Sequence, residues 1–258
     1  MSTWSSCSME EVSAASPNSL RWFQLYIMND RKVSQNLVQR AEKNGYKAII
    51  VTVDGVAHGR RYRNLRNKFT WPSNLPPKNF DAGFMKGTSE IGKDIDSSMD
   101  QSVTWKDIDW LRSITDLPII IKGILTVEMA LEAVEHGVAA IVVSNHGGRR
   151  LDSTLPAIHA LPQIAKAVNG RCEIYFDSGI RNGGDVAKAI ALGAKAVFVG
   201  RPIIWGLACG GEKGAEKVLE ILRDEFEVSM KLLGVTSIAE LQSVPDLVIH
   251  ESKISSRL

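Results

Sequence analysis

The sequence predicts an α/β protein in which parallel strands alternate with helices around a barrel, and two observations support this. A glycine at the end of a helix-like stretch is followed three residues later by an alanine that opens a short apolar run, at Gly45, Gly137 and Gly193. Glycine suits a left-handed helix end, and a continuous β-branched run suits a strand buried on both faces. In addition, polar or charged residues end nearly every run. A barrel gathers such residues at one mouth, whereas an open doubly wound sheet, the rival architecture, spreads them along a crevice.

The individual elements follow from the same hydrophobic patterns. Seven strands are predicted, at residues 2–6, 21–27, 49–54, 118–122, 141–146, 173–177 and 197–201. Helices are predicted at 127–136 after the N-cap Thr126, at 185–192 after two glycines, and at 214–233, where the pattern is amphipathic. We predict a single domain, residues 1–258, with a polar, lid-like loop at 55–104 that is too long for an ordinary βα connection.

The bulk composition excludes several classes of partner. The chain has 258 residues, a net charge of +2 and 44% hydrophobic residues, which is typical of a globular protein that binds neither nucleic acid nor an acidic membrane. The three cysteines form no CxxC pair, so we expect no metal site and no disulfide framework. No apolar run reaches the roughly 18 residues of a membrane span.

The last three residues are Ser256, Arg257 and Leu258. A C-terminal Ser-Lys-Leu is a peroxisomal import signal, and Arg in place of Lys keeps the charge. We therefore expect a peroxisomal location and an import receptor as partner; the alternative is an unspecific polar tail.

A candidate anion site occupies the loops after the last two predicted strands. Glycines let backbone N–H groups approach an anion, a helix N-terminus adds a favourable dipole, and arginines form forked hydrogen bonds to phosphate. In barrels such a site lies after strands 7 and 8, so residues 2–6 become strand 2 and strand 1 is absent. The alternative is a pair of Gly-rich turns with solvated arginines. The candidate residues are Asp177, Ser178, Gly179, Ile180, Arg181, Gly200 and Arg201.

A candidate acid–base site follows the strand predicted at 141–146. His146 stands at its end and Arg149 three residues further on, a spacing that suits a general base beside a carboxylate clamp. Asp54 ends another predicted strand and is a candidate carboxylate partner for the histidine. The alternative is that these side chains are structural, as a single His or Asp more often is.

Lys122 ends an apolar strand, where a charge is expected to be paired or functional. It could form a Schiff base, as in aldolase barrels, or place positive charge beside an electron-accepting ring. The residues alone leave both alternatives open.

Several motifs together resemble one known family. Residues 144–149 are Ser-Asn-His-Gly-Gly-Arg; the other matching motifs are Trp-Phe-Gln-Leu-Tyr at 22–26, Thr-Val-Asp at 52–54, Arg-Arg at 60–61, Ile-Lys-Gly at 121–123 and Gly-Arg-Pro at 200–202. In this order, over nearly the whole chain, they resemble the FMN-dependent 2-hydroxyacid oxidases and dehydrogenases. Residues 204–209 and the closing tripeptide resemble the peroxisomal, long-chain type.

The resemblance implies a role for each matching residue. His146 corresponds to the catalytic base, and Asp54 to the carboxylate that orients it. Arg61 and Arg149 correspond to the clamp on the substrate carboxylate, and Tyr26 to a hydrogen-bond partner of the substrate. The FMN ring and ribityl chain are expected at Ser2, Gln24, Thr52, Lys122 and Ser144, and the ribityl phosphate at Asp177, Ser178, Gly179, Ile180, Arg181, Gly200 and Arg201.

The implied activity is oxidation of an L-2-hydroxyacid to a 2-oxoacid, with O₂ reoxidising the FMN to give hydrogen peroxide. The resemblance also implies a homo-oligomer, a tetramer in the family, and a role in fatty acid metabolism.

The chain departs from the family in two respects. Ser178 stands where the family usually has a second glycine, and we expect it to crowd the phosphate loop. Family members also carry a further N-terminal part, so we expect a (β/α)₈ TIM-type barrel that lacks the N-terminal helices and the first strand. A catalytically inactive truncated form is therefore one alternative function, and a flavin-free aldolase-type barrel is another.

Overall fold

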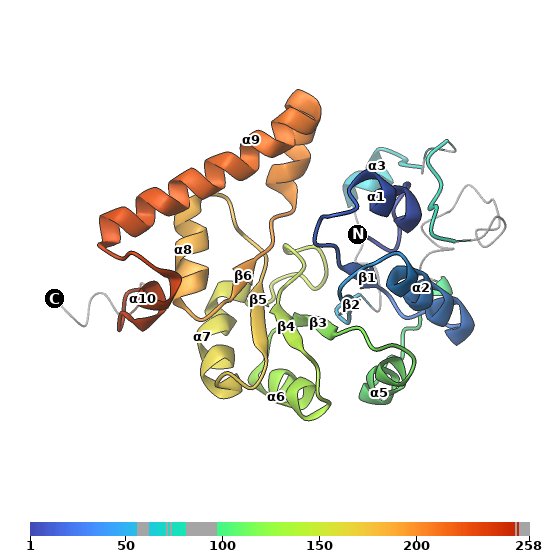
Figure 1. Ribbon diagram of the computed structural model, residues 1–258, viewed down its shortest axis with the longest axis horizontal. Helices are drawn as coiled ribbons and strands as arrows, with labels where there is room; N and C mark the ends of the chain where they lie inside the picture. The colour runs from blue at the N-terminus through green and yellow to red at the C-terminus, as the bar shows by residue number, and fades with distance from the viewer. Residues whose placement is uncertain (56–61, 71, 73, 81–96, 251, 253–258) are drawn as a thin grey trace. The chain divides into compact units, whose positions relative to one another are not determined.

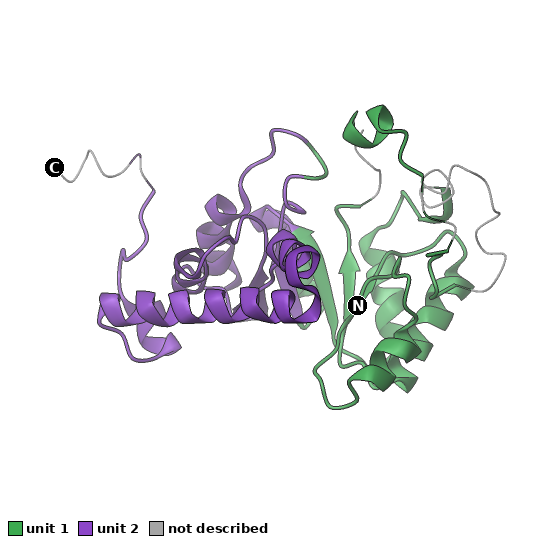
Figure 2. Ribbon diagram, turned by 90° about the horizontal axis from the view of Figure 1, so that it is seen from above, with its two compact units in different colours: residues 1–123, 133–139, 149–151 green, residues 124–132, 140–148, 152–258 purple. Residues whose placement is uncertain are grey.

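The computed structural model describes residues 1–55, 62–70, 72, 74–80, 97–250 and 252, which form two compact units. Unit 1 comprises residues 1–123, 133–139 and 149–151, and unit 2 comprises residues 124–132, 140–148 and 152–258 (Figure 2). Both units are built from parallel strands that alternate with helices (Figure 1). This confirms the predicted α/β class.

Unit 1 contains three parallel strands whose spatial order follows the chain. They are β1 (Phe23–Leu25), β2 (Ile49–Thr52) and β3 (Ile119–Ile124), although the last residue of β3 already belongs to unit 2. The helices of this unit are α1 (Met9–Ala15), α2 (Arg31–Lys43), α3 (Tyr62–Arg66) and α5 (Trp105–Ser113).

The core of unit 1 lies between these strands and the apolar stripe of α2. Leu37, Val38 and Ala41 of α2 are buried, at a spacing that places them on one face of the helix. The ring of Phe23 meets that of Tyr46 edge-on, with the centroids 6.1 Å apart. Burial of each large apolar side chain contributes about 1.5–3 kcal/mol to folding.

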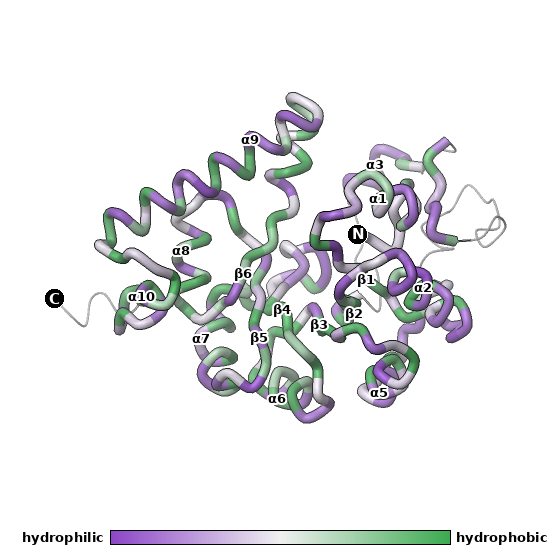
Figure 3. The backbone as a smooth tube through the Cα atoms, in the orientation of Figure 1, coloured by the Kyte–Doolittle hydropathy of each residue, from purple (hydrophilic) through white to green (hydrophobic). Residues whose placement is uncertain are grey.

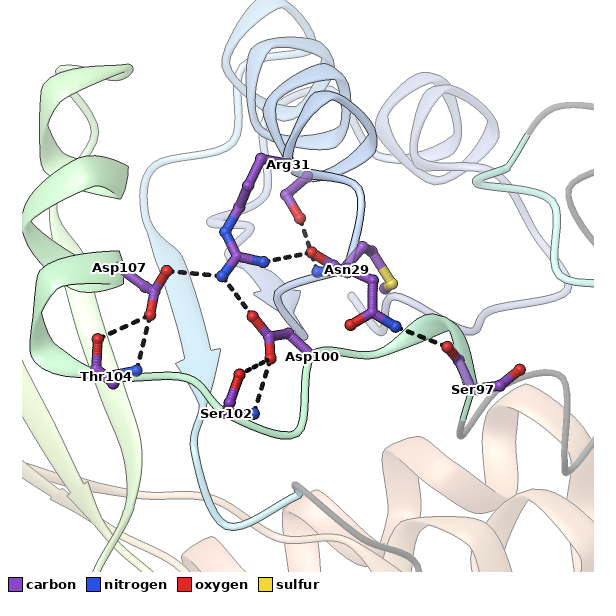
Figure 4. A network of polar contacts seen from close by, with 9 residues as sticks. Asn29, Arg31, Ser97, Asp100, Ser102, Thr104 and Asp107 are labelled. Atoms are coloured by element: carbon purple, nitrogen blue, oxygen red, sulfur yellow. Dashed lines mark hydrogen bonds and ion pairs between the residues drawn. The ribbon is translucent and has the colours of Figure 1, made fainter.

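A polar network in unit 1 joins the start of α2 to the segment before α5 (Figure 4). The Arg31 guanidinium forms ion pairs with Asp100 and, at 2.7 Å, with Asp107. Asp100 also accepts hydrogen bonds from Ser102, and Asp107 accepts from the backbone N–H of Thr104, the N-cap of α5. The two carboxylates therefore hold three segments of this unit together.

Unit 2 repeats the same alternation. Its strands are β4 (Ala140–Val143), β5 (Glu173–Phe176) and β6 (Ala196–Val197). Its helices are α7 (Ala157–Val168), α8 (Gly183–Ala191), α9 (Arg201–Leu233) and α10 (Ile238–Ser243), and α6 (Val127–Glu135) begins here and ends in unit 1. All four residues of β4 are buried, as the continuous apolar run predicts.

Helix α9 is longer than predicted and is interrupted by a kink. Gly210 and Gly211 have non-helical backbone angles, so that two helical segments meet there. The segments approach closely at Gly206 and Gly214, because a Cβ atom at Gly206 would lie 2.5 Å from the Gly214 carbonyl oxygen. Hydrophilic and hydrophobic residues alternate along the helix, consistent with the predicted amphipathic pattern (Figure 3).

The predicted helix ends are confirmed, because Gly45, Gly137 and Gly193 all have positive φ, at 75°, 65° and 108°. The predicted strands start or end one to four residues away from the observed bounds. One reason is that isolated backbone hydrogen bonds extend the pairing beyond the assigned strand ends. An example is the hydrogen bond of 2.9 Å from the Val53 N–H to the Lys122 carbonyl. Of the predicted loop at 55–104, residues 56–61, 71, 73 and 81–96 lie outside the described residues, and the described part includes the short helix α3. The lid-like role of this loop stays a prediction.

The strand predicted at residues 2–6 is wrong, so the described chain has six strands rather than seven. This segment forms turns, in which the Ser2 hydroxyl accepts from the Trp4 N–H and the Ser5 hydroxyl accepts from the Cys7 N–H. Serine side chains that bind nearby backbone groups compete with strand pairing. Met1 accepts a backbone hydrogen bond from the Gln24 N–H of β1 at 2.8 Å, whereas Thr3 reaches this strand through its hydroxyl, which donates to the Gln24 carbonyl, and through its N–H, which donates to the Gln24 side chain.

Within the described part of the chain, no helix combines the length and apolarity needed to cross a membrane.

Candidate active site

A row of polar side chains lies at the carboxyl ends of the strands of unit 1. The Gln24 amide donates to the Thr52 hydroxyl at 3.1 Å and accepts from the Thr3 N–H at 3.2 Å. Thr52 and Lys122 are register partners on β2 and β3. The structure therefore brings together three of the residues predicted to surround a flavin ring.

Asp54 lies directly beside the end of β3. A Cβ atom at Gly123 would come within 2.7 Å of the Asp54 Cβ atom, and Gly123 has a φ of +109°. Only glycine tolerates both the contact and this backbone angle. The Ile-Lys-Gly motif therefore makes room for the partly buried Asp54 side chain.

Tyr26 is held by an arginine that we did not predict. The Arg150 guanidinium donates to the Tyr26 hydroxyl and stands over its ring, while Gly55 packs so closely that a Cβ atom there would lie 2.4 Å from the Tyr26 ring. The predicted Arg149 is exposed and makes no hydrogen bond or ion pair with any described residue. The sequence indicates only that two arginines are adjacent at positions 149 and 150. It does not indicate which of the two side chains contacts Tyr26.

The His146 loop, residues 145–148, follows β4 in unit 2 in an unusual backbone conformation. His146, Gly147 and Gly148 have successive positive φ angles of 58°, 68° and 70°. This region is unfavourable for a residue with a Cβ atom, so His146 needs support from its surroundings.

Side-chain oxygens supply that support, because each backbone N–H of the His146 loop donates to one. The Ser144 hydroxyl accepts a hydrogen bond from the His146 N–H at 3.0 Å, and the side-chain oxygen of Asn145 accepts one from the Gly148 N–H at 3.1 Å. The Ser178 hydroxyl accepts from Asn145 at 3.3 Å and from Gly147 at 3.0 Å. Ser144 is fully buried, which anchors the loop to the core.

The loop after β5 lies against the His146 loop. Ser178 and Gly179 both have positive φ, at 84° and 82°, and the Ser178 hydroxyl donates to the Asp177 carboxylate at 2.8 Å. At the start of α9, the Arg201 guanidinium donates to the Gly147 carbonyl. Three loops that follow successive strands of unit 2 are thus joined by hydrogen bonds.

These loops line a cavity of about 420 Å³ in unit 2 that is open to solvent on one side. Its lining combines positive side chains with open backbone. Arg181, Lys188 and Arg201 line it together with one acid, Asp185, and added Cβ atoms at Gly148 and Gly179 would meet nothing within 4 Å. The N-terminus of α8, capped by Asn182, also begins beside these residues. Such a lining suits a phosphate group.

Residues 1–247 match the family described as FMN-dependent dehydrogenase. The chain belongs to this family. It is 50% identical over 246 residues to 2-hydroxyacid oxidase 1 of Mus musculus, covering 92% of this chain and 66% of that protein. It is 47% identical over 244 residues to 2-hydroxyacid oxidase 2 of Bos taurus, covering 93% of this chain and 67% of that protein.

A crystal structure of mandelate oxidase is similar in fold, with a TM-score of 0.86 at 44% identity, over 94% of this chain and 67% of that chain. The FMN-dependent dehydrogenase relatives are thus longer, and this chain spans about two thirds of their length. The relatives named here are oxidases, which gives the aldolase alternative no support.

The cavity of unit 2 fits the phosphate end of FMN. Three cations balance the charge of a phosphate dianion and of Asp185, and the absence of side chains at Gly148 and Gly179 leaves open space beside the backbone. Lys188 had not been predicted, since a lysine on an exposed helix face carries no special sequence signal. The predicted residues that line the cavity are Ser178, Gly179, Ile180, Arg181 and Arg201.

The remaining predicted residues are placed as follows. Ser2 is exposed, and Asp177 is partly buried and accepts a hydrogen bond from the Ser178 hydroxyl. Gly200 precedes α9 as its N-cap. Arg61 and residues 256–258 lie outside the described residues.

Proposed function

We propose that this chain binds FMN and oxidises an L-2-hydroxyacid to a 2-oxoacid. The observation that carries the proposal is the cavity of unit 2, whose cationic and glycine lining is hydrogen-bonded directly to the loop that bears His146. A phosphate-binding cradle and a candidate base are thereby held in one structure, as the proposed reaction requires.

The residues that would hold FMN fall into two groups. Gly179, Ile180, Arg181 and Arg201 line the cavity and would bind the ribityl phosphate, with Asp177 and Gly200 beside them. In unit 1, Gln24, Thr52 and Lys122 form the polar row at the strand ends. Ser2 of unit 1 and Ser144 of unit 2 complete the proposed set. When bound, FMN supplies the electron acceptor, and reoxidation by O₂ gives hydrogen peroxide.

The protein's own groups would then bind and deprotonate the substrate. His146 would accept the proton of the substrate hydroxyl, and Asp54 is the second proposed catalytic residue. Tyr26, Arg149 and Arg61 would hold the carboxylate, for which forked arginine hydrogen bonds are well suited. Complete alignment of the reacting groups can lower an activation barrier by at most about 7–11 kcal/mol.

Purification of the chain followed by an absorbance spectrum tests the cofactor directly. We expect flavin bands, and we expect oxygen consumption with peroxide formation when an L-2-hydroxyacid is added. A colourless protein that gains no flavin bands on incubation with FMN would refute the proposal. A yellow protein without turnover would support the alternative of an inactive flavin-binding form.

We also propose peroxisomal import through Ser256, Arg257 and Leu258, and assembly as a homo-oligomer acting on 2-hydroxyacids of fatty acid metabolism. A fluorescent protein fused to this C-terminal segment should collect in peroxisomes, and deletion of Leu258 should disperse it. A diffuse signal from the intact segment would contradict the targeting. Sedimentation of the purified chain tests the oligomer.

A further inference from the structure

The Ser178 hydroxyl has no remaining capacity for a ligand. A serine hydroxyl can donate one hydrogen bond and accept two. In this structure it donates to the Asp177 carboxylate and accepts from the backbone N–H groups of Asn145 and Gly147. All three positions are therefore filled by the protein itself, although Ser178 lines the cavity.

The two amides that Ser178 binds flank His146 in the sequence. The N–H of Gly147 donates to Ser178 while its carbonyl accepts from Arg201, so this peptide segment is held from both sides. His146 between them has a φ of +58°, a conformation that persists only where the surroundings enforce it. Ser178 itself has a φ of +84°, so its own backbone is strained while its hydroxyl makes these bonds.

We infer that Ser178 is a positioning residue, whose hydroxyl holds the His146 loop through the amides of Asn145 and Gly147 and does not bind the cofactor phosphate. This deepens the proposed function and rests on it where turnover is concerned. It also replaces the expectation that Ser178 crowds the phosphate loop. The hydroxyl bonds to the neighbouring loop, while the open space beside Gly179 is left for an anion.

The test uses Ser178→Gly in the full chain. Glycine accepts a φ of +84° without strain, so this variant should fold while losing the hydroxyl together with its Cβ atom. Amide hydrogen exchange of the FMN-free chain is measured by NMR at single residues. We expect exchange at Asn145 and Gly147 to become roughly fivefold faster or more, because each amide loses a hydrogen bond. FMN affinity, measured by quenching of flavin fluorescence, should not change.

Two further variants sharpen the result. Ser178→Ala removes the same hydroxyl but keeps the Cβ atom, and it should reproduce the faster exchange. Ser237→Gly is the matched control, because Ser237 caps α10 through its hydroxyl and does not line the cavity. It should leave the amides of Asn145 and Gly147 and the affinity for FMN unchanged.

Weaker FMN binding in Ser178→Gly, or exchange at both amides as slow as in the unmodified chain, would overturn the inference. In a chain that turns over, the variant should also lower kcat while the Kd for FMN stays constant. The exchange measurement needs neither cofactor nor substrate. A chain that oxidised no hydroxyacid would therefore refute the proposed function without deciding the role of Ser178.

Discussion

The Arg150 guanidinium donates a hydrogen bond of 2.7 Å to the Tyr26 hydroxyl, and its central carbon lies 5.8 Å from the centre of the Tyr26 ring. A phenol hydroxyl that accepts one hydrogen bond can still donate its own proton. Arg150 therefore orients Tyr26 without competing for the proton that Tyr26 would donate to a substrate carboxylate.

Replacement of this arginine should weaken substrate binding. Arg150→Met keeps much of the side-chain volume but removes the donor, and we expect kcat/KM for an L-2-hydroxyacid to fall about tenfold, mainly through KM. Steady-state kinetics with FMN in excess measure this. Arg223→Met is the control, because Arg223 is exposed on α9 and, among the residues that the structure describes, forms an ion pair only with its neighbour Asp224. Equal kinetics in both variants would contradict the role of Arg150.

Replacement of the proposed base, His146, should lower the rate of substrate oxidation without weakening FMN binding. We expect His146→Gln to lower kcat by about 10²–10⁴-fold while FMN stays bound, because a positioned base typically contributes that much. Stopped-flow reduction of the flavin and the flavin spectrum provide the two measurements. His159→Gln, an exposed histidine on α7, is the matched control and should behave as the unmodified chain. Near-normal turnover of His146→Gln would exclude His146 as the base.

The two proposed anion sites should respond to different substitutions. Arg201→Ala should weaken FMN retention, because it removes a cation from the cavity and the bond to the Gly147 carbonyl. Arg149→Lys should keep FMN but raise KM and lower kcat, since lysine cannot make a forked contact to a carboxylate. Equilibrium dialysis with FMN and steady-state kinetics distinguish them. If Arg149→Lys lost FMN and Arg201→Ala kept it, the two assignments would be reversed.

The network around Arg31 should make the stability of the chain depend on acid pH (Figure 4). Burial opposes ionisation of Asp100, but hydrogen bonds from Arg31 and Ser102 outweigh it and lower the pKa of this carboxyl group. The pKa of Asp107 is likewise lowered, by hydrogen bonds from Thr104 and Arg31 that outweigh its burial. A carboxyl group with a depressed folded-state pKa stabilises the fold above its unfolded pKa, about 3.9 for Asp, and this stability is lost as pH falls through the folded value.

We therefore expect Asp100→Asn to lower the Tm at pH 7 and to reduce the further fall in Tm between pH 5 and strongly acid pH. Thermal unfolding followed by circular dichroism at a series of pH values measures both effects. Asp116→Asn, at an exposed position outside the network, is the control and should reproduce the profile of the unmodified chain. A Tm profile of Asp100→Asn that parallels the unmodified one would show that the network contributes no acid-sensitive stability.

Local chemistry was sufficient to predict the architecture. Gly45, Gly137 and Gly193 were assigned to left-handed helix ends because only glycine enters that region at low cost, and all three have positive φ. The buried β4 was predicted from four consecutive apolar residues. Gly179, Ile180, Arg181 and Arg201 were assigned to one anion site because parallel strands place successive loops at the same edge, and these residues line one cavity.

The strand predicted from the residue types at 2–6 was wrong. The residue types there allow a strand, but serine hydroxyls bind the backbone N–H groups of Trp4 and Cys7 instead. A serine hydroxyl can bind a nearby backbone N–H, or that N–H can pair with a neighbouring strand. Which of the two occurs depends on the hydrogen-bond partners that the neighbouring strand presents, and these are set by the tertiary structure.

The partners of individual polar side chains were decided by the tertiary structure alone. Arg150, not Arg149, contacts Tyr26, across a sequence separation of 124 residues. Ser178 bonds to Gly147, 31 residues away, although its sequence position indicated only a phosphate loop. Residue type sets how many hydrogen bonds a side chain can make, but only the folded chain brings a distant donor or acceptor within about 3 Å of it.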